Sequence, residues 1–266
     1  MKTSFVNSAD GTKLRIGKAG EGPENVLIVP GLAEHMGRYE YVVARLVSAG
    51  FSITFLEPRG HGGSGGKRGH VQRWSRLRED VEAAATTIDG PLFLLGHSTG
   101  GLISLYTALD GLANGIRGLA LSAPNVVDTV DAPIKKAASS LISIIAPTMS
   151  FATGLDSSLL SRDPAVGQSY DADPLVYGTI TARFFVEMIA AQRRVVAAAP
   201  EGVLPLLLMV GEQDDIVDSP SSIAMAKGWK TPATIITYPE LYHEIFNEPE
   251  RDQVLSDLID WLRTQE

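Results

Sequence analysis

Residues 92–101 read LFLLGHSTGG, and residues 102–106 continue as LISLY. An apolar run typical of a buried strand is joined here to a helix-like stretch through the pattern G-x-S-x-G. Gly96 and Gly100 lie two positions to either side of Ser98, where a side chain would collide with its neighbours in a sharp turn. This context predicts a strand, a strained turn that exposes the Ser98 hydroxyl, and a helix. The alternative is a glycine-rich turn in which Ser98 only caps the helix.

Other short apolar runs alternate with segments of helical spacing on both sides of this turn. The runs are residues 26–29, 53–56, 92–95, 119–121, 206–210 and 234–237. Continuous apolar runs of this length are typical of strands buried on both faces of a parallel sheet. The spacing predicts helices over residues 39–49, 79–88 and 254–262. The alternation predicts an α/β fold with a doubly wound, mostly parallel sheet, whose functional groups lie in loops at the carboxyl ends of the strands.

Two segments depart from this alternation. Residues 10–11, Asp-Gly, lie between apolar positions and predict the turn of an opening hairpin. Residues 125–200 contain no clear strand but have amphipathic stretches at 134–145 and 181–199. An insertion of this kind predicts a helical cap over the sheet. The expected organisation is a first part of the α/β core at residues 1–124, the cap at 125–203, and a second part of the core at 204–266.

The overall composition excludes several classes of protein. With Lys+Arg 23, Asp+Glu 31 and a formal net charge of −8 in 266 residues, the chain has no clustered basic face for nucleic acid. It contains no cysteine, which excludes disulfides, thiolate metal sites and a cysteine nucleophile. Residues 1–11 lack the apolar run of a signal peptide, and no apolar stretch is long enough to span a membrane. We therefore expect a soluble, cytoplasmic protein; its oligomeric state stays open.

A serine hydroxyl is a weak nucleophile unless a base accepts its proton. Of the five histidines, His243 lies between the last strand and the C-terminal helix, where the triad order Ser, Asp, His places the base. His97 is expected to be a packing residue. His35 and His61 are expected to make structural hydrogen bonds, and His70 to be exposed.

The imidazole in turn needs a carboxylate that fixes its tautomer. Residues 211–218, GEQDDIVD, follow the strand at 206–210 and offer four acids. We select Asp214, although sequence position alone leaves Asp215 and Asp218 open.

The tetrahedral intermediate of an acyl transfer also needs two backbone N–H donors. Thr99, directly after the nucleophile, is expected to supply one of them. Leu32, in the loop PGLAEH (residues 30–35), is expected to supply the other. This chemistry requires no metal and no cofactor.

These segments together resemble the monoacylglycerol lipase and lysophospholipase group of the α/β hydrolases over almost the whole chain. The matching motifs are GLAEH at residues 31–35 with GRY at 37–39, RGHG at 59–62 with Ser64, GHSTGG at 96–101, DPL at 173–175, GEQD at 211–214 and YHE at 242–244. The resemblance implies the α/β-hydrolase fold with an inserted helical cap, and a triad of Ser98, Asp214 and His243. It also implies oxyanion donors at Leu32 and Thr99. Supporting roles fall on Gly31, His35, Gly96, His97, Gly100 and Asp218.

The sequence departs from the group's pattern at four positions near the site. Pro30 replaces a usual histidine, Ala33 a second glycine, Glu57 an aspartate and Thr99 a methionine. None of these changes removes a member of the triad. The resemblance therefore supports the catalytic mechanism more firmly than it supports monoacylglycerol as the substrate.

The expected function is hydrolysis of carboxylic esters through an acyl-enzyme, as in a monoacylglycerol lipase, on a small-molecule ester or monoacylglycerol. A lysophospholipase, a short-chain carboxylesterase, a peptidase, a thioesterase and an acyltransferase are alternatives with the same triad. A non-catalytic receptor of the same fold is an alternative of another class. The largely apolar residues 141–145, interrupted by Ser143, would line an acyl channel, make transient contact with a lipid interface, or pack between cap helices.

Overall fold

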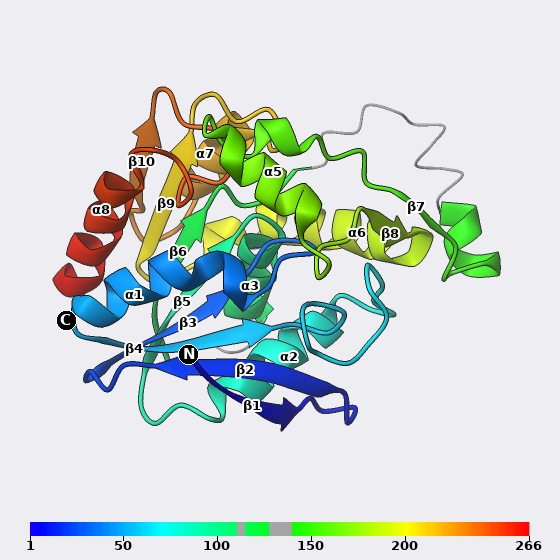
Figure 1. The fold of residues 1–266 in the computed structure, drawn as a ribbon, viewed down its shortest axis with the longest axis horizontal. Helices are drawn as coiled ribbons and strands as arrows, with labels where there is room; N and C mark the ends of the chain where they lie inside the picture. The colour runs from blue at the N-terminus through cyan, green and yellow to red at the C-terminus, as the bar shows by residue number, and fades with distance from the viewer. Residues whose placement is uncertain (111–114, 128–139, 266) are drawn as a thin grey trace.

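The computed structural model describes residues 1–110, 115–127 and 140–265 (Figure 1). Its main feature is an eight-stranded sheet in the order β1-β2-β4-β3-β5-β6-β9-β10. Its strands are β1 (Lys2–Asn7), β2 (Lys13–Ala19), β3 (Glu24–Val29), β4 (Phe51–Glu57), β5 (Leu92–His97), β6 (Ile116–Ser122), β9 (Leu206–Gly211) and β10 (Thr234–Tyr238). All neighbours from β4 to β10 are parallel, and only the pairs β1/β2 and β2/β4 are antiparallel. The predicted sheet is confirmed.

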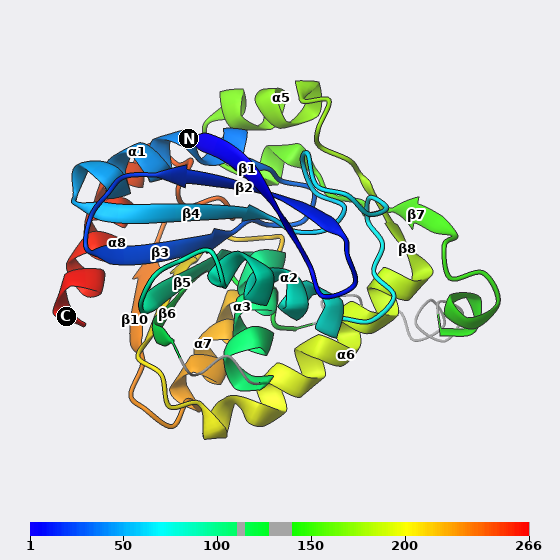
Figure 2. The ribbon, with the colours of Figure 1, turned by 90° about the horizontal axis from the view of Figure 1, so that it is seen from below.

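Helices cover both faces of the sheet, as Figure 2 shows. The 3-10 turn η1 (Met36–Tyr39), α1 (Glu40–Ser48) and α8 (Arg251–Thr264) pack on one face, and α2 (Ser75–Ala85), α3 (Thr99–Asp110) and α7 (Ser219–Lys227) on the other. Side chains along each central strand alternate between the two cores, so that Val26 and Ile28 face one and Leu27 and Val29 the other. Both faces are apolar because both are covered. None of the helices within the described residues is long and apolar enough to cross a membrane.

The expected segments match these elements apart from their ends. The Asp-Gly turn joins β1 to β2, with Gly11 at φ 82°. The helix expected over residues 79–88 begins at Ser75 and ends at Ala85. Its buried face begins one turn earlier, at Leu77, and Thr87 and Ile88 form only short-range turns after it.

The insertion lies between β6 and β9 and extends from the upper middle (α5) to the right-hand side (α6, β7 and β8) of Figure 1. It comprises β7 (Ser150–Ala152), η2 (Ser157–Leu159), α5 (Pro164–Ala172), β8 (Thr179–Thr181), α6 (Ala182–Ala198) and η3 (Ala199–Glu201). The expectation of no strand here is wrong, because β7 and β8 form an antiparallel pair too short to give a periodic pattern. The helix expected over 181–199 is α6. Of the stretch 134–145, residues 134–139 lie outside the described residues and 140–145 are helical.

Candidate active site

Ser98 lies in a strained turn at the carboxyl end of β5. Its φ of 51° is in the left-handed region that side chains disfavour. Hydrogen bonds hold the turn in place: Ser98 N–H donates to the Ser122 carbonyl (2.9 Å), and the Ser98 carbonyl accepts from Leu102 (3.2 Å) and Asn125 (3.0 Å). Because only backbone atoms make these contacts, the hydroxyl stays available for chemistry.

The two glycines around Ser98 permit very close packing. A Cβ on Gly96 would lie 2.5 Å from the carbonyl oxygen of Gly100, and one on Gly100 would lie 2.2 Å from that of Val29. Neither backbone oxygen can move aside. The glycines therefore bring the turn directly against the end of β3, next to the loop that carries Leu32.

His243 and Asp214 form a buried pair on the loops after β10 and β9. His243 Nδ1 lies 2.8 Å from Asp214 Oδ2, and neither side chain is more than 4% exposed. Asp214 Oδ1 also accepts from the N–H groups of Ile216 (2.8 Å) and Val217 (3.0 Å). With Nδ1 bound to the carboxylate, Nε2 is the nitrogen left to act toward Ser98, which lines the same cavity.

The contact between His243 and Asp214 raises the pKa of the histidine and lowers the pKa of the aspartate. Burial lowers the pKa of His243, but the charge and hydrogen bond of Asp214, helped by Glu244 and Glu34, outweigh burial and raise it above 6.5. Burial raises the pKa of Asp214, and His243 and two backbone donors more than offset this. Asp214 therefore remains ionised, and its charge would stabilise an imidazolium at His243.

The raised pKa of His243 predicts the acid limb of the pH profile. A base must be neutral to accept a proton, so kcat/KM should fall as the pH drops through the pKa of His243. Because this pKa is raised, we expect the midpoint of the limb above pH 6.5. A kcat/KM profile with a soluble ester measures it, and a midpoint below 6.5 would contradict this assignment of the base.

The other acids of the loop have different positions. Asp218 caps the N-terminus of α7, accepting from Ser221 N–H (3.3 Å) and Ser221 Oγ (2.6 Å). Asp215 lines the cavity. Of the three acids that the sequence left open, Asp214 is the one hydrogen-bonded to His243.

Leu32 and Thr99 both line the cavity at the ends of β3 and β5. Within the described residues, neither of their backbone N–H groups donates a hydrogen bond. Between Leu32 and Glu34, Ala33 has a φ of 65°. The alanine that replaces a glycine of the motif thus keeps the glycine-like conformation, at a cost of about 1–2 kcal/mol.

The remaining histidines surround the site without reaching its centre. His97 packs on His243 with ring centroids 4.9 Å apart and binds Ser122 Oγ (3.0 Å); burial lowers its pKa to about 4, so it is neutral. His35 Nε2 lies 2.6 Å from Asp173 Oδ2, a contact between core and cap. His61 Nδ1 contacts the Arg59 carbonyl. The expectation that His70 is exposed is wrong: it is partly buried and binds the hydroxyl of Thr181, because the cap covers it.

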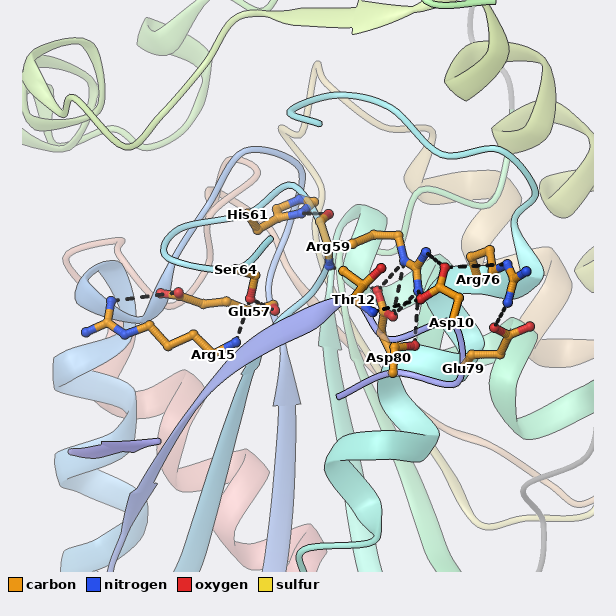
Figure 3. Close-up of polar contacts among 11 residues, drawn as sticks. Asp10, Thr12, Arg15, Glu57, Arg59, His61, Ser64, Arg76, Glu79 and Asp80 are labelled. Atoms are coloured by element: carbon orange, nitrogen blue, oxygen red, sulfur yellow. Dashed lines mark hydrogen bonds and ion pairs between the residues drawn. The ribbon is translucent and has the colours of Figure 1, made fainter. Parts of the chain in front are cut away.

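The RGHG motif lies in a polar cluster beneath the cap, drawn in Figure 3. Arg59 bridges the buried Asp80 (2.6 Å) and Asp10 (2.7 Å). Glu57 accepts from the N–H groups of Gly63 (2.7 Å) and Met36 (3.1 Å). The glutamate thereby ties the loop after β4 to the end of the loop that carries Leu32.

One cavity of about 740 Å³ connects these groups, within the usual range for small-molecule sites. Its walls come from both core and cap. The apolar lining residues include Leu32, Val127, Phe151, Leu155, Leu159, Leu160, Ile180, Phe185, Met188, Ile216 and Val217. Sequence reasoning did not identify the individual cap residues, because nothing in their spacing shows which of them face the serine.

The sheet order and the strained serine at the carboxyl end of β5 define a serine hydrolase of the α/β-hydrolase class. The chain matches the family described as serine aminopeptidase, S33, over residues 21–250, and belongs to it.

Individual relatives agree with this assignment. The chain is 34% identical over 245 residues to a monoacylglycerol lipase of Mycolicibacterium smegmatis, covering 89% of this chain and 87% of the relative. It is 30% identical over 237 residues to the phospholipase YtpA of Bacillus subtilis, covering 86% and 91%. The crystal structure of the Paleococcus ferrophilus monoacylglycerol lipase matches with a TM-score of 0.89 at 31% identity, covering 95% of this chain and 99% of the other. The resemblance expected from the motifs is confirmed.

Proposed function

We infer that this protein hydrolyses carboxylic esters, with monoacylglycerols as its substrate class, and that residues 125–203 act as the cap of its site. The observation that carries this proposal is that Ser98 and His243 border one largely apolar cavity while Asp214 holds the other nitrogen of the imidazole. Monoacylglycerol lipases among the relatives support the choice of substrate.

The residues account for each step of the reaction. Ser98 Oγ attacks the ester carbonyl and gives its proton to His243 Nε2, while the N–H groups of Leu32 and Thr99 bind the oxyanion. The intermediate expels the alcohol, which takes the proton from His243 and leaves an acyl-Ser98. Water then attacks the acyl group with His243 as base, releasing the fatty acid and restoring the serine.

The direct test is labelling by a fluorophosphonate probe together with release of fatty acid from a monoacylglycerol. We expect stoichiometric labelling and turnover. Binding of the lipid without labelling or turnover would favour a receptor instead. Faster cleavage of aminoacyl amides than of esters would favour the peptidase activity in the family's description.

The charge around the cavity favours a neutral substrate over an anionic one. Its acidic lining residues are Glu34, Asp156, Asp215 and Glu244, and the described residues that line it include no lysine or arginine. Arg38 forms ion pairs with Glu34 and Glu244. Its charge therefore offsets those two carboxylates and not the negative charges of Asp156 and Asp215. These two carboxylates repel a phosphate group.

We therefore expect kcat/KM for a monoacylglycerol to exceed that for a lysophosphatidate of the same chain length by at least about tenfold. Asp156→Asn should raise the lysophosphatidate value by about fivefold and leave the monoacylglycerol value unchanged. Asp163→Asn is the matched control, because Asp163 also caps a helix and does not line the cavity. Equal rates on both lipids in the wild type would contradict the argument.

An exposed apolar surface on the cap leads into this cavity. Ile144 and Ile145 are 71% and 73% exposed, and Leu141 and Met149 are also exposed. Phe151 and Leu155 are exposed and line the cavity as well. The exposure favours transient contact with a lipid interface over packing within the cap. Because the chain carries a net charge of −8, this contact is hydrophobic rather than electrostatic.

Replacing Ile144 and Ile145 together by Asp should lower the turnover of emulsified monoacylglycerol by about tenfold or more, since two apolar anchors are lost. Turnover of a water-soluble short-chain ester should stay within about twofold. Val203→Asp, an exposed apolar position near the amino end of β9, is the control. Unchanged turnover of the emulsion would argue against interfacial contact.

A further inference from the structure

A chain of buried charges connects the loop of Leu32 to the loop of His243. Arg38, in η1, donates through Nε to Glu34 Oε1 (3.1 Å). Its NH2 group reaches both carboxylate oxygens of Glu244, at 2.6 and 2.8 Å. No side chain of the three is more than 8% exposed. Glu244 directly follows His243, so one guanidinium joins the two loops on which the reaction depends.

Glu34 also fixes the backbone from which the Leu32 N–H projects. Its Oε2 accepts from the Gly31 N–H at 2.7 Å and from the Tyr39 hydroxyl at 2.5 Å. Its own N–H donates to the Gly31 carbonyl at 3.2 Å. Since both ends of Gly31 are bound to Glu34, the peptide between Gly31 and Leu32 has little freedom to rotate.

The carboxylate of Glu34 is occupied by the protein and not free for a substrate. One oxygen binds Arg38, and the other binds Gly31 and Tyr39. The second void at this cluster measures about 10 Å³, which is room for about one water molecule and not for a substrate group. Apart from its charge, which helps to raise the pKa of His243, any effect of Glu34 on the reaction must therefore pass through the atoms it holds.

Stability alone gives no reason for this arrangement. Two carboxylates and one guanidinium are removed from water, and buried ion pairs are often no more stable than apolar side chains of the same size. Burial opposes ionisation of Glu34, yet Arg38, the hydrogen bonds from Tyr39 and Gly31 and, at a pH low enough to protonate it, His97 hold the pKa of Glu34 below the usual range. Burial and repulsion from Glu34 raise the pKa of Glu244 despite Arg38. The cluster keeps Glu34 charged although its removal from water costs free energy.

We propose that Glu34 is a positioning residue for the Leu32 oxyanion donor, and that Arg38 couples this donor to the histidine loop through Glu244. The proposal rests on the proposed function of Ser98, His243 and Leu32. It assigns to the three charged residues a role in transition-state binding and not in substrate binding.

The test compares Glu34→Ala with Glu34→Gln on a soluble p-nitrophenyl ester. Alanine should lower kcat per active site by about 100-fold, the scale of losing one oxyanion donor, with KM within about threefold. The glutamine variant should have a kcat about tenfold higher than the alanine variant, because its amide oxygen can still accept a hydrogen bond from the Gly31 N–H. Glu40→Gln is the matched control: Glu40 is exposed, and it lies six positions away on the same segment. It should leave kcat unchanged.

Two further measurements separate positioning from a general structural role. Affinity for a trifluoromethyl ketone, which forms a tetrahedral oxyanion on the serine, should fall across the variants in proportion to kcat/KM. Active sites are counted by fluorophosphonate labelling. If kcat per labelled site stays at the wild-type value, the proposal is wrong, whatever the yield of folded protein. If the alanine variant does not fold, the glutamine variant decides.

The coupling is tested by combining Glu34→Gln with Glu244→Gln. Since both carboxylates act through Arg38, the double variant should lose less kcat than the product of the two single losses. A strictly multiplicative loss would overturn the coupling. Failure of the proposed function is a different result, because then the wild-type chain itself would neither be labelled nor hydrolyse the ester.

Discussion

Ser98→Ala should abolish ester hydrolysis, lowering kcat by about 10⁵-fold while the protein remains folded. The loss is large because the bond to the acyl group forms at the Ser98 oxygen, and no other group can replace it. Stability should change little, since the turn is held by backbone hydrogen bonds and alanine meets the same strain at φ 51°. Single-turnover kinetics with a p-nitrophenyl ester and a thermal unfolding curve measure the two effects.

Ser104→Ala is a suitable control for this variant. Ser104 lies on the same helix, α3, and its buried hydroxyl has no hydrogen-bond partner among the described residues. We expect its kcat to remain within about twofold of the wild-type value, because the substitution breaks no interaction. Wild-type activity in Ser98→Ala would show that another residue is the nucleophile.

Asp214→Asn should lower kcat by about 10⁴-fold. The amide can still accept from the N–H groups of Ile216 and Val217, so the loop should keep its shape. It can no longer stabilise an imidazolium, and its NH2 group favours the tautomer of His243 that leaves Nε2 protonated. The same change should remove the main cause of the raised pKa of His243.

The control for Asp214→Asn is Asp260→Asn, at an exposed position on α8. We expect that variant to retain wild-type kcat and the wild-type pH profile. If Asp214→Asn kept more than about a tenth of the wild-type kcat, the assignment of the acid would be refuted, and Asp215 or Asp218 would have to be tested next.

The fold could be predicted because its signals are local. The central strands are continuous apolar runs, since both of their faces are covered, and every predicted run lies in a strand. The serine turn was recognisable because its geometry leaves no space for side chains at Gly96 and Gly100. The three-residue strands β7 and β8 gave no such signal.

The sequence by itself determined the sheet, the position of the serine turn and the order in which the acidic loop 211–218 and His243 follow it along the chain. Only the tertiary structure decided which acid of residues 211–218 lies beside His243, that His70 is covered by the cap, and that Arg38 joins Glu34 to Glu244. Arg38 and Glu244 are 206 positions apart. Strands and tight turns are set by neighbouring residues, whereas contacts of this kind depend on where the packed sheet places the loops at its edge.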